Sequence, residues 1–365
     1  MRRALVVALL LLLIPPAAWS CPFCSPAEAD LFSELAEAQS VVLVSKVESQ
    51  KYKILQVLKG QAPVGKVVLA GEPRGTAGKD SSLLLTTAAP ANLPYWSDAP
   101  RYLTPADLAF VKTALPLARA SDAKKWDFGA AHLEKGSPEV ATAAYSLLAS
   151  APLSEAQKRA KTVGHGKLLG WVKSSKVPEE RRALYLLMAY PGLSPADAPW
   201  LKTALFHPKL SPVSPLLGPY VVGYLQVAGA AGVPEIEKHF LTPTLPATRT
   251  LPVTRALALV GHRTTSPALK SAVKAAFLKE VAHPHRGPFA IAPLAVWKER
   301  KAAPAVEKLA KDNQSITWIK VAVIRYFRSF DSLEAKGALT RLSESDANLV
   351  MRTQDAYKVA DLGIE

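Results

Sequence analysis

Cysteine is nearly missing from this chain. Only Cys21 and Cys24 occur among its 365 residues, and together they form one Cys-Pro-Phe-Cys motif. A structural zinc site needs four ligands, and no histidine precedes His132, so the motif supplies too few ligands for zinc. Ser25 stands where covalent haem attachment requires a histidine after the second cysteine, which excludes a c-type haem.

Long apolar runs are missing as well. Ala4–Ile14 has eleven residues, whereas a helix needs about 20 to span a bilayer. Ala18-Trp19-Ser20 places small residues at positions −3 and −1 of a cut before Cys21. We predict a signal peptide over residues 1–20, export to the periplasm or beyond the cell, and a mature chain that is not an integral membrane protein. An N-terminal anchor helix that is never cleaved stays an alternative. Lipid attachment at Cys21 is a less favoured one, because Trp19 is bulky where lipoprotein processing prefers a small residue.

Catalytic motifs are the third absence. The sequence has no His-Glu-x-x-His, Gly-x-Ser-x-Gly, Walker-type or dinucleotide-binding pattern. Gly164–Lys167 lacks the spacing and the Ser/Thr of a phosphate loop. Among seven histidines only His283 and His285 cluster, with Glu280 as the one nearby carboxylate, which is typical of a surface loop. We predict no enzyme activity, no cofactor and no metal, although a catalytic group assembled from distant residues stays open.

Acidic residues are few relative to basic ones, and the formal net charge is +15. Residues 101–340 carry 33 basic against 17 acidic side chains, while residues 21–100 carry 7 against 8 and residues 341–365 carry 3 against 5. Such a positive field attracts anionic surfaces. In an exported protein it predicts an acidic glycan, an anionic lipid headgroup or an acidic protein as partner and argues against nucleic acid; ordinary solvated helix faces are the alternative. The candidate surface residues are Lys270, Lys274, Lys279, Lys320, Arg325 and Arg328.

Aromatic residues share a helix with the last three of these cations. Aromatic rings beside basic side chains suit glycans or acidic peptides. The helical spacing of Ile316, Ile319, Val323 and Phe330 instead predicts that most of the aromatics are core. The aromatic residues concerned are Trp318, Tyr326, Phe327 and Phe330.

Residues 21–100 predict a leading helix and a small β-rich head. Leu31, Leu35 and Ala38 have helical spacing, after which β-branched and apolar residues alternate between Gly turns. The expected strands are 41–47, 51–58 (with a bulge), 66–70 and 82–87. Short strands separated by Gly turns favour a small barrel of the oligonucleotide/oligosaccharide-binding or netrin-like type.

The pattern of residues 101–345 predicts many short helices, which favour a HEAT-like α-solenoid. Residues 346–365 are expected to form an acidic C-terminal tail. The fold class is therefore α+β. Some helices, such as Ala183–Ala189, are apolar on all sides and must be covered, whereas others have a polar face. Hydroxyl caps followed by proline mark helix starts. These pairs are Ser25-Pro26, Thr104-Pro105, Ser137-Pro138, Ser194-Pro195 and Ser266-Pro267.

Several segments resemble an exported, uncharacterised protein family of planctomycete-type bacteria. The resemblance spans most of the mature chain, and its Cys-Pro-Phe-Cys-Ser motif is the most specific part. It implies export and an overall fold of the kind expected above, and it carries no named activity. In place of a mid-chain acid in the family pattern this chain has Ala143. The matching segments are 21–25, 38–44, 54–60, 95–98, 223–229 and 319–326.

The Cys21/Cys24 pair has more than one interpretation. An exported pair predicts a local disulfide that closes a very small loop. A thiol redox site is the alternative, since the helix start after Cys24 favours a thiolate. The head also resembles the netrin-like inhibitors of metalloproteinases, which place a mature N-terminal cysteine on the protease zinc. Cys21 is the matching position, although that group has Cys-x-Cys and further cysteines.

We therefore expect an exported, non-enzymatic scaffold or a protein that binds an anionic ligand or another protein. The alternatives are a thiol-disulfide redox protein that uses Cys21 and Cys24, and a metalloproteinase inhibitor that acts through Cys21.

Overall fold

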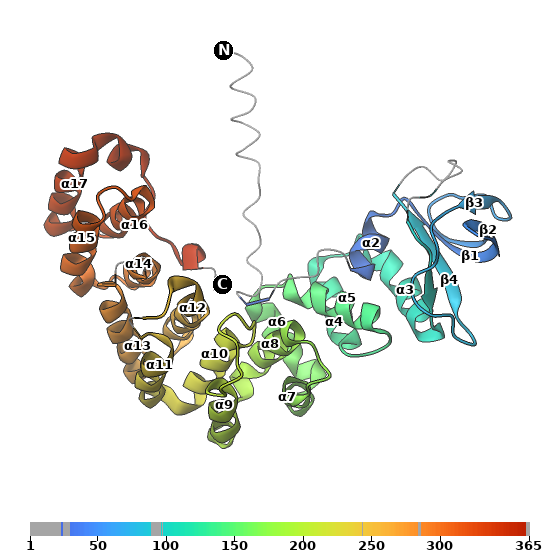
Figure 1. Ribbon diagram of the computed structural model, residues 1–365, viewed down its shortest axis with the longest axis horizontal. Coiled ribbons are helices and arrows are strands. Elements are labelled where there is room, and N and C mark those ends of the chain that lie inside the picture. The colour runs from blue at the N-terminus through green and yellow to red at the C-terminus, as the bar shows by residue number, and fades with distance from the viewer. Residues whose placement is uncertain are drawn as a thin grey trace, which may run out of the picture. The chain divides into compact units, whose positions relative to one another are not determined.

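The computed structural model describes residues 23–24, 30–88, 96, 98–242, 244–283 and 286–362 (Figure 1). The chain divides into two compact units. The sheet unit comprises Ser25–Ala151 and Arg159–Val163, and the helical unit comprises the remainder. The predicted signal peptide, Cys21, the Ser25 cap and His285 lie outside the described residues, so those expectations stay predictions.

The sheet unit begins with α2 (Leu31–Glu37). The carboxylate of Asp30 accepts hydrogen bonds from the backbone N–H groups of Phe32 and Ser33 at 2.8 and 3.1 Å, which fixes the start of this helix. An antiparallel sheet of five strands follows, in the order β3-β2-β1-β4-β5. The strands are β1 (Ser40–Glu48), β2 (Lys51–Lys59), β3 (Val67–Leu69), β4 (Ser82–Thr87) and β5 (Arg101–Leu103).

The β1–β2 pairing shifts register at three places, which confirms an irregularity in this hairpin. β5 was not expected from the sequence. In the described part of the chain the sheet is open, with β3 and β5 at its edges, and a closed barrel is not confirmed. The backbone N–H of Trp96 nevertheless donates to the carbonyl of Leu69 in β3 at 2.8 Å. Trp96 therefore contacts β3, the edge strand opposite β5.

Each face of the sheet has its own core. Val42, Tyr52, Ile54 and the fully buried Trp96 pack on one face, where alternate residues of the strands meet. The other face packs under α2 and the helices that follow the sheet. These helices are α3 (Pro105–Leu117), α4 (Asp122–His132) and α5 (Pro138–Ala149).

Asp107 ties two of these helices together. Its carboxylate accepts from the backbone N–H and hydroxyl of Thr104 at 3.1 and 2.8 Å, and from the backbone N–H of Ser137 at 3.0 Å. The predicted hydroxyl caps at Thr104, Ser137 and Ser266 are confirmed. Ser194 begins a short 3-10 helix, where its backbone N–H and its hydroxyl both donate to the Asp197 carboxylate.

The helical unit consists of α-helices joined mostly by short loops. Gly164 separates α6 from α7. Its φ of +96° is a backbone conformation that suits glycine. The first helices are α6 (Leu153–Val163, shared with the sheet unit), α7 (His165–Lys173), α8 (Glu179–Ala189), α9 (Ala198–Leu205), α10 (Leu217–Ala228) and α11 (Gly232–Phe240). The others are α12 (Ala247–Arg263), α13 (Pro267–Glu280), α14 (Gly287–Val296), α15 (Ala303–Asp312), α16 (Thr317–Arg328) and α17 (Leu333–Arg352).

Five helices of this unit, the even-numbered ones from α8 to α16, form a continuous buried row. In the order α8, α10, α12, α14 and α16, each packs against the next, and the other helices pack alongside them (Figure 1). Ala183–Ala189 of α8 is buried on all sides, as its uniformly apolar sequence predicts. Helices that alternate between a covered and a half-covered position explain the two kinds of helix sequence.

Candidate anion-binding site

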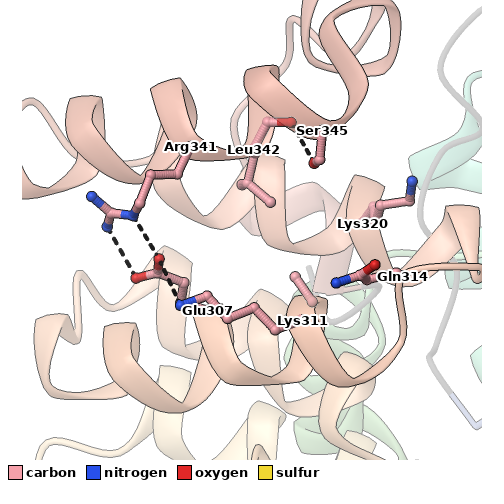
Figure 2. Close-up of a pocket in the computed structure, with 8 residues that line it drawn as sticks. Glu307, Lys311, Gln314, Lys320, Arg341, Leu342 and Ser345 are labelled. Carbon is pink, nitrogen blue, oxygen red and sulfur yellow. Dashed lines mark hydrogen bonds and ion pairs between the residues drawn. The ribbon is translucent and has the colours of Figure 1, made fainter.

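A pocket of about 280 Å³ opens between the last three α-helices of the helical unit, α15, α16 and α17. α15, α16 and α17 each contribute a cation to its wall (Figure 2). Lys320 is one of the residues singled out from the sequence, whereas Lys311 and Arg341 were missed. The lining residues are Glu307, Ala310, Lys311, Gln314, Lys320, Arg341, Leu342 and Ser345.

Glu307 bridges two of these cations. The guanidinium of Arg341 donates to its carboxylate from Nε at 2.8 Å and from Nη2 at 3.1 Å, and Lys311 Nζ lies 3.7 Å from it. The hydrogen bonds from Arg341 hold the pKa of Glu307 below its usual value. Glu307 is therefore ionised at neutral pH and fixes the position of Arg341 at one end of the pocket (Figure 2).

Lys320 stands at the other end of the pocket, beside Gln314 (Figure 2). Its amino group donates to Asp346 at 3.0 Å, and this bond lowers the pKa of the Asp346 carboxyl. Asp346 has a non-helical φ of −160° inside α17, and its carboxylate accepts from the backbone N–H of Leu349 at 3.2 Å. Lys320 thus anchors the residue that caps the last turns of α17.

Two of the three predicted surface lysines of α13 form ion pairs with separate partners. Lys274 pairs with Glu299 at 3.1 Å, and Lys279 pairs with Glu237 at 2.9 Å. Lys270 is half-buried on the same helix. None of these three lines the pocket between α15 and α17.

The remaining two predicted cations hold the C-terminal segment against α16. Arg325 donates to Asp361 at 2.7 Å, and its guanidinium lies 4.2 Å from the centre of the Tyr357 ring. Arg328 donates to the carbonyl of Val350 at 2.8 Å. The chain's own acidic tail therefore supplies an anion to this part of the predicted surface.

The aromatic residues of α16 are mostly core, as their spacing predicts. Tyr326 and Phe327 are buried, and the Tyr326 hydroxyl donates to the carbonyl of Glu299 at 2.7 Å. Trp318 differs, because half of its side chain is exposed and its ring faces Phe289 of α14, with 6.0 Å between ring centres.

Cys24 is only 8% exposed. Burial is more typical of a structural cysteine than of a thiol that attacks external disulfides. Cys21, the other half of the predicted pair and the residue on which the inhibitor alternative depends, lies outside the described residues.

The described residues contain no group of three or more His, Cys, Asp or Glu side chains placed to hold a metal ion. Within the same residues, none of the helices combines the length and the apolarity that crossing a bilayer requires. No protein-family model, curated protein or solved structure matches the chain.

Proposed function

We propose that this chain is an exported, non-enzymatic binding protein whose helical unit binds an acidic glycan at the pocket between α15, α16 and α17. The observation that supports this most strongly is the set of three cations around one pocket, Lys311, Lys320 and Arg341, with an amide and a hydroxyl between them. Cations suit the carboxylate or sulfate groups of such a glycan, and the amide and hydroxyl suit its ring hydroxyls.

The donors of this pocket are only partly used. Lys311 Nζ lies 3.7 Å from Glu307, which is longer than a hydrogen bond, and its side chain is 68% exposed. Three cations face two carboxylates, those of Glu307 and Asp346. An anionic group that enters the pocket therefore meets a net positive charge and at least one free ammonium donor.

The rest of the architecture fits a scaffold. We propose that the continuous row of even-numbered helices is the inner layer of a HEAT-like solenoid, and that the sheet unit is a barrel-like head. Stacked helical pairs offer an extended surface on which a polymer contacts more than one site, so the pocket would hold one charged group of a longer chain.

Isothermal titration of the exported protein with a heparin-derived oligosaccharide tests the proposal. We expect saturable binding that weakens steeply as salt rises, because the attraction is between exposed charges. The K311Q and R341Q variants should each bind about tenfold more weakly, since each removes a charge-assisted hydrogen bond.

Two matched controls separate the pocket from bulk charge. Lys308 lies on α15 and Lys336 on α17, both exposed and both paired with a nearby acid, and neither lines the pocket. K308Q and K336Q remove the same charge and should leave binding unchanged. Equal losses in all four variants, or tighter binding to polyglutamate or to phosphatidylserine vesicles than to the oligosaccharide, would contradict the proposal.

A further inference from the structure

A second pocket, of about 300 Å³, lies wholly within the sheet unit. Its wall combines side chains of both charges, from α2, from the segment that precedes β4, from β5, and from the first turn and a half of α5. The polar residues that line it are Asp30, Glu34, Arg74, Arg101, Glu139 and Thr142.

Two of the three carboxylates in this pocket already form hydrogen bonds or ion pairs within the protein. Asp30 caps α2, and its second oxygen also accepts from the Ser33 hydroxyl at 2.8 Å. Glu34 accepts from the Thr86 hydroxyl at 2.6 Å and forms an ion pair with Arg101. These bonds join α2 to β4 and β5, so Asp30 and Glu34 form a fixed wall rather than free ligand-binding groups.

Arg74 and Glu139 remain without an ion pair within 4 Å among the described residues. The backbone of Arg74 is held firmly beside β5: its N–H donates to the carbonyl of Pro100 at 2.7 Å, and its carbonyl accepts from the N–H of Tyr102 at 3.1 Å. Glu139 is exposed in the first turn of α5. The pocket therefore presents one uncommitted cation and one uncommitted anion, more than 4 Å apart.

Arg101 adds a third unsatisfied group. Its side chain is 14% exposed, and its Nε–H is buried without a hydrogen-bond partner among the described protein atoms. That N–H is closed off from solvent, so a carboxylate bound to Arg74 would meet Arg101 only through the part of its side chain that lines the pocket.

We propose that this pocket binds a small zwitterion, a molecule with one carboxylate and one ammonium group. The carboxylate lies against Arg74 and Arg101, and the ammonium lies against Glu139. Thr142 donates its hydroxyl proton to the carbonyl of Pro138 at 2.7 Å, which leaves its oxygen lone pairs to accept from the ammonium. A simple anion is disfavoured by the carboxylates of Glu34 and Glu139, and a simple cation is disfavoured by the two guanidinium groups.

A length series of ω-amino acids tests the proposal on the full exported chain. Glycine, β-alanine, 4-aminobutyrate and 6-aminohexanoate differ only in the separation of their two charges. We expect saturable binding with a clear optimum at one length, measured by titration calorimetry at up to about 10 mM ligand. Acetate and methylammonium each carry one of the two charges and should bind at least tenfold more weakly than the optimal member.

Charge-neutral variants locate the site. R74Q and E139Q should each weaken binding of the optimal ω-amino acid about tenfold, since each removes one charge-assisted contact. Arg119 and Glu37 are exposed residues of the same unit outside the pocket, so R119Q and E37Q serve as matched controls with unchanged binding. Arg74 and Glu139 are exposed, and their substitution should leave the unfolding midpoint unaltered, which separates lost binding from lost folding.

Three results would overturn the inference. One is no saturable binding of any member of the series. Another is equal affinity for acetate and the best ω-amino acid, which would show that Glu139 does not contribute to binding. The last is equal loss of binding in R74Q and R119Q, which would replace the pocket by general surface charge.

Discussion

Replacing Arg286 by methionine should destabilise the helical unit strongly. Arg286 is 3% exposed and Glu280 is 8% exposed, and the two form a buried ion pair with 3.0 Å between Nε and Oε2. The same guanidinium donates to the carbonyls of Thr242 at 2.8 Å and Leu241 at 3.3 Å. One side chain therefore joins the end of α13 to the segment that follows α11.

Most of the expected loss of stability comes from the Glu280 carboxylate, which stays buried without its partner. Removing one partner of a buried ion pair typically costs about 3–5 kcal/mol, because the other charge stays buried without compensation. The two carbonyls also lose their donor, and an unsatisfied buried acceptor costs about 1–3 kcal/mol. These costs overlap, so we expect R286M to lose about 3–5 kcal/mol of unfolding free energy at neutral pH.

The loss should depend on pH in a defined direction. Burial raises the pKa of Glu280 above its usual value of 4.5, and the charge of Arg286 opposes part of that rise. Without Arg286 the pKa of Glu280 moves higher still. A carboxyl whose folded pKa is raised binds its proton more tightly in the folded state, so stability falls as pH rises above 4.5. The deficit of R286M should therefore be larger at about pH 8 than at about pH 5.

Urea unfolding of the wild type, R286M, E280M/R286M and K279M at both pH values measures these losses of unfolding free energy. The double variant E280M/R286M removes both charges and should recover most of the lost stability, because apolar residues of similar size often replace a buried ion pair at little cost. K279M removes an exposed pair with Glu237 and should cost less than about 1 kcal/mol. A deficit in R286M that is independent of pH, or a double variant no more stable than R286M, would refute the reasoning.

Three further changes have defined outcomes. A Cβ on Gly218 would lie 2.1 Å from the Phe23 ring, so G218A should lose about 1–3 kcal/mol in urea unfolding and expose the segment at Phe23 to proteases. R325Q removes the anchor of Asp361, and hydrogen exchange should show faster opening of the C-terminal segment with little change elsewhere. Y326F removes a buried hydrogen bond worth about 1 kcal/mol. Burial raises the pKa of Tyr326 above 10.0, so the wild type should lose this advantage as pH rises above 10.0.

Local signals explain how much of the fold was predictable. A serine or threonine followed by proline marks a true helix start at Thr104, Ser137 and Ser266. The hydroxyl of each cap residue accepts a hydrogen bond from the free backbone N–H three residues later. β5 was missed because three residues, Arg101–Leu103, carry no alternation long enough to detect, and only their pairing with β4 makes them a strand. The helical region was expected to end at residue 345, yet α17 reaches Arg352 because Asp346 caps further turns.

The candidate site was harder to predict than the fold. Lys320 could be named from its helix, but its partner Asp346 is 26 residues away in sequence. Arg341 and Glu307 are 34 residues apart, and each alone looks like an ordinary charge on a helix surface. Charge density along a chain shows where cations are frequent, and only the fold shows which of them face an acid and which face a pocket.

The acidic tail changes what the net charge of the helical region means. Residues 101–340 carry 33 basic and 17 acidic side chains, which by itself suggests a broad cationic surface. On α16, however, Arg325 is bound to Asp361 and Lys320 to Asp346, and both acids come from the segment beyond residue 340. The two cations that an external anion would meet there are already held by the protein itself. An anionic partner therefore has more to gain at Lys311, whose ammonium group lies 3.7 Å from Glu307 and makes no short hydrogen bond to it.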